Sequence, residues 1–163
     1  MEYRKLPKGT EQISVIGLGN SSLGDTSEAE KTIELAIENG INYFDMAAGD
    51  AAPFPAYGAV TAGCRDKVYF QVHFGADYRT GKYGWTLKLD EIKRSVDWQL
   101  KALQTDYIDL YYQHRVDPKV EPETVAETMA QLKKEGKIRA WGISCVEEDY
   151  LRRAHAVCPV SAV

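Results

Sequence analysis

The sequence has few cysteines, and none of them is placed for a disulfide framework or a metal site. Cys64, Cys145 and Cys158 are an odd number of thiols, widely separated, and they form no C-x-x-C pair or Cys/His cluster. We therefore expect three reduced thiols that pack as small apolar side chains, with no disulfide and no structural zinc.

The chain also has no excess of positive charge and no long apolar run. It contains 20 Lys and Arg against 24 Asp and Glu, for a formal net charge of −4. This balance excludes a strongly basic nucleic-acid-binding protein and provides no basic patch for a membrane surface. No apolar run approaches the roughly 20 residues of a membrane span. The polar start, MEYRKLPKGTEQ, lacks a signal-peptide core. We expect a cytoplasmic protein that binds neither nucleic acid nor membrane.

What the sequence does have is enough apolar residues for a sizeable core and a regular alternation of elements. Of the 163 residues, 44% are hydrophobic, and no low-complexity linker divides them, so we expect one domain over residues 1–163. Short apolar runs predict strands at 13–16, 41–45, 68–72, 107–112 and 138–143, and the start of a sixth strand at 160–163. Helical spacing follows several of these runs, for example from the capping pattern of Ser27 and Glu30 to Gly40.

Alternating strands and helices predict an α/β fold with a parallel sheet. Two architectures fit this pattern: a doubly wound open sheet and a (β/α) barrel. Gly17, Leu18 and Gly19 begin a dinucleotide-binding fingerprint, but the third glycine position is Ser22, so this motif is weak support for the open sheet.

Polar residues stand where the predicted strands end. Asn20 follows the first strand, Asp45 ends the second, His73 the third, His114 the fourth and Ser144 the fifth. In a parallel barrel these strand ends share one face, and active sites are built there. The sequence therefore predicts a pocket at this face.

The chemistry that these residues offer is proton transfer. An imidazole with a pKa near neutral can act as a general acid, and a carboxylate such as Asp45 can adjust that pKa. His73, His114, Asp45 and Asp50 could also ligate a metal, but the sequence has neither an H-x-H pair nor two histidines at i, i+4. We expect no metal.

Five segments, in order and in register, resemble the aldo/keto reductase family. They are GINYFDMA, RDKVYF, LQTDYIDLYYQHRVD, LKKEGKIRAWGIS and RRAHAVCPVSAV. The resemblance implies a (β/α) barrel whose members use NADPH or NADH to reduce aldehydes and ketones. It also implies a site of Asp, Tyr, Lys and His, in which the Tyr is the usual proton donor.

Two of these four positions match the family and two differ. Asp45 matches the family Asp and His114 the family His, whereas Asp50 stands at the Tyr position and His73 at the Lys position. The nearby pair Tyr57-Gly58 fits a later Leu-Gly of the family pattern better than the catalytic Tyr. A site with Asp50 and His73 can still donate a proton through the His73 imidazole, and this is our hypothesis for the catalytic group.

The resemblance implies cofactor contacts as well. Gly19 and Asn20 after the first strand and Ser144 after the fifth correspond to the nicotinamide side of the family's cofactor site. Five β/α units and the start of a sixth strand predict a partial barrel. The motifs FDMAAGD and HFGADY are similar to a bacterial branch of the family.

The hypothesis that follows is a truncated aldo/keto-reductase-like oxidoreductase acting on a small carbonyl substrate. The alternative is a non-catalytic barrel fragment, either an interaction and assembly module or a remnant or recombined gene product. Because a partial barrel has two unpaired strand edges, we also expect self-association.

Overall fold

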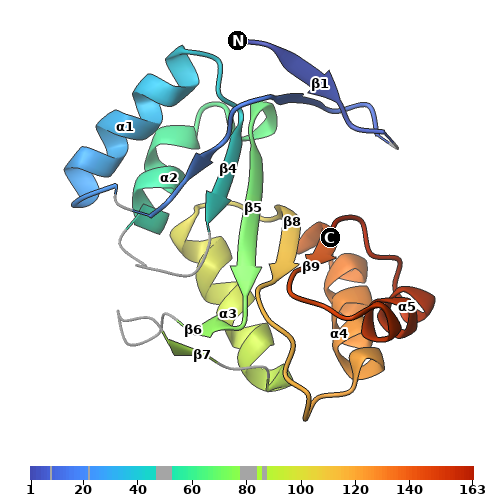
Figure 1. The fold of residues 1–163 in the computed structure, drawn as a ribbon. Helices are drawn as coiled ribbons and strands as arrows, with labels where there is room; N and C mark the ends of the chain where they lie inside the picture. The colour runs from blue at the N-terminus through green and yellow to red at the C-terminus, as the bar shows by residue number, and fades with distance from the viewer. Residues whose placement is uncertain (8, 22, 47–52, 78–83, 86–87) are drawn as a thin grey trace.

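Five parallel strands form the centre of the computed structural model, which describes all residues except 8, 22, 47–52, 78–83 and 86–87 (Figure 1). Across the sheet the strands follow the order β3-β4-β5-β8-β9. Their bounds are Leu18–Gly19, Tyr43–Met46, Tyr69–Phe74, Ile108–Gln113 and Ile138–Ile143. The helices of the described residues are α1 Thr26–Glu38, α2 Pro53–Thr61, α3 Leu89–Ala102, α4 Pro122–Lys134 and α5 Glu148–Val157, with a short 3-10 turn at Arg65–Lys67.

The strand order distinguishes between the two expected architectures. Doubly wound sheets reverse their strand order at a switch point, whereas a (β/α) barrel adds each new strand beside the previous one. Here every parallel strand pairs with the next one along the chain. A parallel bridge between Gly142 and Ala162 then begins a sixth position beside β9. The prediction of an α/β fold with five β/α units and the start of a sixth strand is confirmed.

The expected first strand at residues 13–16 is wrong in place and in partner. Gln12–Ser14 forms β2, which pairs antiparallel with β1, Tyr3–Lys5, beyond the N-terminal ends of β4 and β5 (Figure 1). The first parallel strand is the next segment, Leu18–Gly19. An alternating apolar pattern does not reveal the strand's partner, and the two-residue β3 is too short to produce a periodic signal. A second small ribbon, β6 Ala76–Asp77 with β7 Gly84–Trp85, follows β5.

Two helix starts also differ from the sequence pattern. The capping box of α1 is formed by Asp25 and Glu28, since the Asp25 side chain accepts from the Glu28 N–H, so the pairing of Ser27 with Glu30 is wrong. Residues 53–61 form α2, which begins with Pro-Phe-Pro. Prolines at the first and third helical positions are tolerated there because first-turn N–H groups have no partner within the helix.

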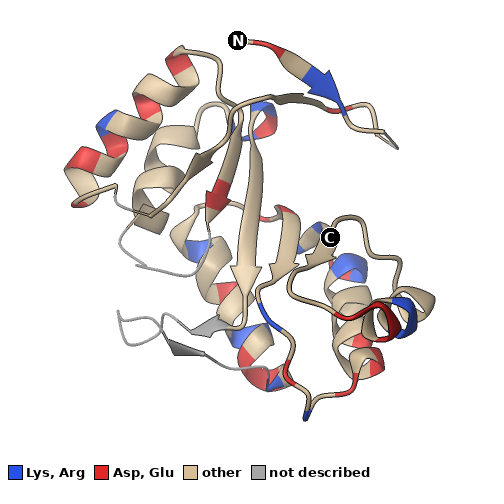
Figure 2. Ribbon diagram, in the orientation of Figure 1, with Lys and Arg blue, Asp and Glu red and all other residues tan. Residues whose placement is uncertain are grey.

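The two faces of the sheet differ in composition. One face packs against the helices and holds large, fully buried side chains, including Phe44, Phe70, Phe74, Tyr111 and Trp141. Strand alternation places Tyr43, Asp45, Gln71, His73 and Tyr112 on the other face, in adjacent register. Charged side chains lie mainly on helices and loops, and the strands are mostly uncharged (Figure 2). The polar side chains on the second face are therefore exceptions among the mostly apolar strand residues.

Among the described residues, no helix has both the length and the apolar character needed to cross a membrane.

Candidate active site

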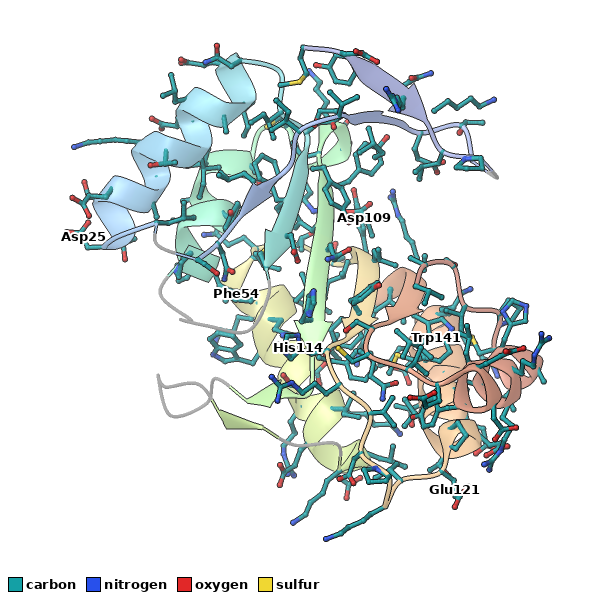
Figure 3. The ribbon with its side chains drawn as sticks, in the orientation of Figure 1. Asp25, Phe54, Asp109, His114, Glu121 and Trp141 are labelled. Carbon is teal, nitrogen blue, oxygen red and sulfur yellow. The ribbon has the colours of Figure 1, made fainter. Side chains whose placement is uncertain are left out.

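A cluster of polar side chains lies at the C-terminal ends of β4, β5 and β8. Asp45 of β4 is opposite Gln71 of β5 in the register, and His73 follows two residues later on the same face. His114 comes directly after β8, where its backbone N–H donates to the Phe74 carbonyl. Parallel pairing thus brings together three residues separated by up to 69 positions in sequence, as the expected barrel topology requires (His114 is labelled in Figure 3).

Asp45, His73 and His114 form a continuous chain of contacts. His73 Nε2 lies 3.2 Å from Asp45 Oδ1, and His73 Nδ1 lies 2.9 Å from His114 Nδ1. Because one of two facing nitrogens must carry a hydrogen for such a contact, a single proton is shared between the two rings. The arrangement is a carboxylate–imidazole–imidazole relay.

Gln71 and Tyr43 extend this cluster along the same face. The Gln71 side-chain N–H donates to Asp45 Oδ1 over 2.8 Å, and the same nitrogen is 3.2 Å from His73 Nε2. The Tyr43 hydroxyl donates to Gln71 Oε1. Asp45 Oδ1 is therefore approached by two nitrogens at once.

The relay changes the pKa of its carboxylate and of its outer imidazole. Burial alone would raise the pKa of Asp45, but hydrogen bonds from His73 and Gln71 and the nearby imidazoles outweigh it, so the net pKa lies below its usual value. Burial, the neighbouring His73 and then Arg115 lower the pKa of His114, and Asp45 opposes them in part. At neutral pH Asp45 is thus an ionised carboxylate, and a proton on His114 is held more weakly than on an ordinary imidazole.

Tyr112 of β8 lines the other side of the His73 ring, with ring centroids 5.2 Å apart. It can lie there because Gly142 is its register partner on β9: a Cβ on Gly142 would come within 2.4 Å of the Tyr112 ring. Burial, then the charge of Asp45, raises the pKa of Tyr112, which therefore keeps its hydroxyl proton.

The predicted cofactor residues differ in their surroundings in the structure. Asn20 is only 3% exposed, and neither polar atom of its side chain has a hydrogen-bond partner among the described residues. An added Cβ on Gly19 would meet nothing closer than the Asp45 carbonyl at 4.0 Å, so space remains there. The Ser144 hydroxyl donates to the His114 carbonyl over 2.7 Å and thereby fixes the loop that carries His114.

Two further residues from the sequence analysis lie away from this cluster or cannot be placed. Asp50, expected at the position of the family Tyr, falls outside the described residues. Tyr57 is fully buried in α2, where its ring packs edge-on against Phe44 at 5.4 Å. This position agrees with a core role for the Tyr57-Gly58 pair.

Sequence reasoning missed Gln71 and Tyr43. A signal for both was present, since each stands two residues before a predicted site residue within a strand: Tyr43 before Asp45, and Gln71 before His73. Residues at i and i+2 share a face of a strand.

Comparisons with known proteins relate this chain to proteins of known sequence and fold. The model of the aldo/keto reductase family matches residues 15–163. Aldo-keto reductase YhdN of Bacillus subtilis is 32% identical over 181 residues, covering 100% of this chain and 53% of that protein. Aldo-keto reductase str7 of Strobilurus tenacellus is 31% identical, with coverages of 95% and 49%. The chain spans about half the length of these relatives.

Solved structures show the same fold. The holo form of aldo-keto reductase AKR11C1 from Bacillus halodurans has a TM-score of 0.84 and 29% identity, and the match covers 98% of this chain and 55% of that one. Glycerol dehydrogenase AKR11B4 from Gluconobacter oxydans has a TM-score of 0.83 at 23% identity, covering 98% and 53%. With a family model that matches nearly the whole sequence, the chain belongs to the aldo/keto reductase family.

Proposed function

We propose that this chain carries the proton-transfer part of a site that reduces an aldehyde or ketone with NADPH or NADH. The observation that carries the proposal is the relay from Asp45 through His73 to His114 at the C-terminal ends of parallel strands. Family membership supports carbonyl reduction as the reaction class. The relay supports it because a carbonyl oxygen needs a proton donor as it becomes negative.

The geometry favours His114 over His73 as the residue that delivers the proton. Both ring nitrogens of His73 face other members of the cluster, Asp45 and Gln71 on one side and His114 on the other, and the ring is buried. His114 is the more exposed of the two histidines. We therefore assign His73 to the middle of the relay and His114 to its substrate end.

The residues present fit a nicotinamide cofactor. Asn20 is buried with an unpartnered carboxamide, which matches the donor and acceptor groups of a nicotinamide amide. Gly19 leaves backbone space beside it, and the oxygen of Ser144 keeps acceptor capacity while its hydrogen is donated to the His114 carbonyl. Asn20, Gly19 and Ser144 would hold the ring, and the reduced cofactor when bound supplies a hydride to the carbonyl carbon.

His114 then completes the reduction. In its protonated form it keeps the Nδ1 hydrogen directed at His73 and donates the Nε2 hydrogen to the carbonyl oxygen, forming the O–H bond of the alcohol. His73 holds its Nε2 hydrogen against Asp45, whose negative charge stabilises the imidazolium before transfer. After transfer both imidazoles are neutral, and solvent returns one proton to His114.

The test is oxidation of NADPH and NADH by the purified chain against a panel of aldehydes and ketones. We expect His114→Gln to lower turnover by about 100-fold, the lower range for loss of a general acid. The matched control is His155→Gln, because His155 is an exposed histidine on α5, outside the cluster, and its loss should leave turnover unchanged. No turnover by the folded parent chain, or equal turnover in His114→Gln, would contradict the proposal.

We also propose that the chain self-associates and is cytoplasmic. The sheet has β3 at one edge and the bridge at Ala162 beside β9 at the other, and unpaired strand edges favour pairing with another chain. The three cysteines are free, as in a reducing compartment. Light scattering over a concentration series tests the first point: a constant monomer mass would contradict it.

A further inference from the structure

Gln71 and His73 both approach the same oxygen of Asp45. We propose that Gln71 is a positioning residue: by occupying Asp45 Oδ1 it weakens the hold of the carboxylate on His73, so that the proton between the two imidazoles can change sides. The inference rests on the function proposed above, because it concerns how the relay is set. It follows from the three distances between Gln71 Nε2, His73 Nε2 and Asp45 Oδ1.

The triangle has nearly equal sides. Gln71 Nε2 is 2.8 Å from Asp45 Oδ1 and 3.2 Å from His73 Nε2, and His73 Nε2 is 3.2 Å from Asp45 Oδ1. The shortest side joins Gln71 to Asp45, so the amide, rather than the imidazole, makes the stronger hydrogen bond to the carboxylate.

The orientation of the Gln71 amide is fixed at both ends. Tyr43 donates its hydroxyl hydrogen to Oε1, and the negative charge of Asp45 requires an N–H on the opposite side. Burial, together with the charge of Asp45, raises the pKa of Tyr43 to about 12, so the hydroxyl remains a donor throughout the working pH range. A flipped amide would place its oxygen against the carboxylate.

Two tautomers of His73 therefore compete. With hydrogen on Nε2, His73 donates to Asp45, and its Nδ1 accepts from His114. With hydrogen on Nδ1, His73 donates to His114, and Nε2 can accept from the Gln71 amide. Asp45 alone would favour the form with hydrogen on Nε2. Gln71 stabilises the other form, because its amide can donate to Nε2, and it weakens the first, because it donates to the same oxygen of Asp45. A relay with two accessible forms can pass a proton in either direction.

The titration of the histidine pair should report this balance. The titratable groups around the pair are Asp45 and Tyr43 of β4, Tyr112 of β8 and Arg115 beside His114. Of these groups, only Asp45 accepts a hydrogen bond from Gln71. Removal of the Gln71 amide should therefore make Asp45 more basic and leave the basicity of the others unchanged. A more basic Asp45 favours the protonated pair, so the titration midpoint of the pair should move upward.

The experiment is an NMR pH titration of the ring signals of His73 and His114 in the full chain and in Gln71→Met. Methionine keeps the length of the side chain and removes the amide. We expect the midpoint of the pair to rise by about one pH unit, the size of one charge-assisted hydrogen bond. The ring nitrogen shifts of His73 should also move toward the Nε2–H form.

Gln99→Met is the matched control. Gln99 of α3 is also held by a tyrosine, since the Tyr111 hydroxyl donates to its Oε1, but its amide donates to the backbone carbonyl of His73 and not to the ring. Its loss should lower stability without moving the histidine midpoint. Gln71→Glu, which keeps the shape and adds charge beside Asp45, should raise the midpoint further than Gln71→Met and serves if the methionine variant fails to fold.

An unchanged midpoint in the folded Gln71→Met and Gln71→Glu variants would overturn the inference, and so would an equal shift in Gln99→Met. The readout needs no substrate, so absence of carbonyl reduction would refute the proposed function while leaving this result interpretable. Conversely, the parent chain could be active and Gln71→Met could show the same acid limb in the pH dependence of kcat as the parent. That result would overturn the positioning role alone.

Discussion

The two ends of the parallel sheet each contain a carboxylate facing nitrogen groups, but the two carboxylates have partners of different chemistry. Asp109, near the N-terminal end of β8, is bound by Arg65 and Arg139, whereas Asp45, near the C-terminal end of β4, is bound by Gln71 and His73. Figure 3 shows Asp109 and His114 toward different ends of the sheet. The partners of Asp109 carry a permanent charge, and the imidazole partner of Asp45 can gain or lose a proton.

The N-terminal cluster is fully satisfied and closed. Arg65 Nη2 lies 2.7 Å from Asp109 Oδ2, which also accepts the Phe70 N–H, and the Asp109 side chain is 11% exposed. The Arg65 guanidinium donates as well to the Thr105 hydroxyl and to the carbonyls of Val68 and Tyr107. Such a group holds the start of β5 and β8 together and offers no proton to a substrate.

The C-terminal cluster is open by comparison. The side chain of Asp45 is 38% exposed and lies on the face of the sheet that the helices do not cover, whereas Asp109 lies on the helix-facing side of β8. In barrel enzymes the C-terminal face carries the chemistry and the N-terminal face carries stability. The two clusters are consistent with that division, since Asp109 is paired with guanidinium groups and Asp45 with an amide and an imidazole.

The largest effect should come from breaking the N-terminal cluster. Asp109→Ala leaves the largely buried Arg65 guanidinium without its carboxylate and the Phe70 N–H without an acceptor. We expect a loss of about 3–5 kcal/mol in the free energy of unfolding, the usual cost of removing one partner from a buried ion pair. Urea denaturation followed by circular dichroism measures it.

If the two ends are separate in function, the folded fraction of Asp109→Ala keeps the turnover of the parent. If the variant is as stable as the parent, this cluster does not stabilise the fold. If the variant is fully folded but has lost its turnover, the cluster has a role in activity as well.

Asp45→Asn should give the converse result. The asparagine keeps the shape of the side chain and loses the charge that stabilises the His114 imidazolium. We expect turnover at neutral pH to fall by about 100-fold, with a smaller change in the urea midpoint than for Asp109→Ala. Comparable destabilisation by both substitutions would remove the contrast between the two ends.

The fold was largely predictable from residue pattern, with specific exceptions. Strands β4, β5, β8 and β9 lie within two residues of the apolar runs that predict them, because each is long enough to alternate visibly. Strand β3 was not found at its place, since two residues carry no periodicity. Helix α2 has no periodic signal that could predict it, because it begins with Pro-Phe-Pro, and in the structure its Phe54 is fully buried.

The cluster of Asp45, His73 and His114 could be anticipated from the sequence, but its contacts could not. The pattern of polar residues at strand ends predicts Asp45, His73 and His114 as site residues, and the structure brings these three together. Which ring nitrogen faces which partner depends on the register of β5 against β8 and on the entry of the loop after β8, and neither can be derived from spacing. For the same reason the sequence favours His73 as the proton donor, whereas in the structure both of its ring nitrogens face other side chains.

A change of pH should affect stability through the C-terminal cluster. The pKa of His114 lies below its ordinary value of 6.5 in the folded protein, so the unfolded chain binds a proton first as the solution becomes acidic. The contribution of His114 to the free energy of unfolding is therefore fully present above the ordinary pKa of 6.5, and it is lost as the pH drops through the lowered pKa of the folded protein. Asp45, whose pKa is also lowered, adds a second loss below its ordinary value of 3.8.

The measurement is the urea midpoint at neutral pH and at about pH 5, in the range where histidine titrates. His114→Gln should flatten the change between these two conditions, and Asp109→Ala should keep it. A parent chain whose midpoint rises on acidification would show that the sign is wrong.

The smallest effect is expected within the N-terminal cluster itself, at the second arginine. Arg139 Nη1 lies 3.4 Å from Asp109 Oδ1, and its guanidinium is 3.7 Å from the centroid of the Tyr107 ring, but its side chain is 59% exposed. Solvent screens such a pair, so Arg139→Met should cost no more than about 1 kcal/mol, and added salt should reduce even that difference. Arg139 and Arg65 bind the same carboxylate but differ in exposure. Arg139→Met removes only the exposed ion pair, whereas Asp109→Ala also breaks the buried one, so the difference between the two losses measures the effect of burial. A loss as large as that of Asp109→Ala would mean that the exposed arginine, and not the enclosed one, holds this end of the sheet.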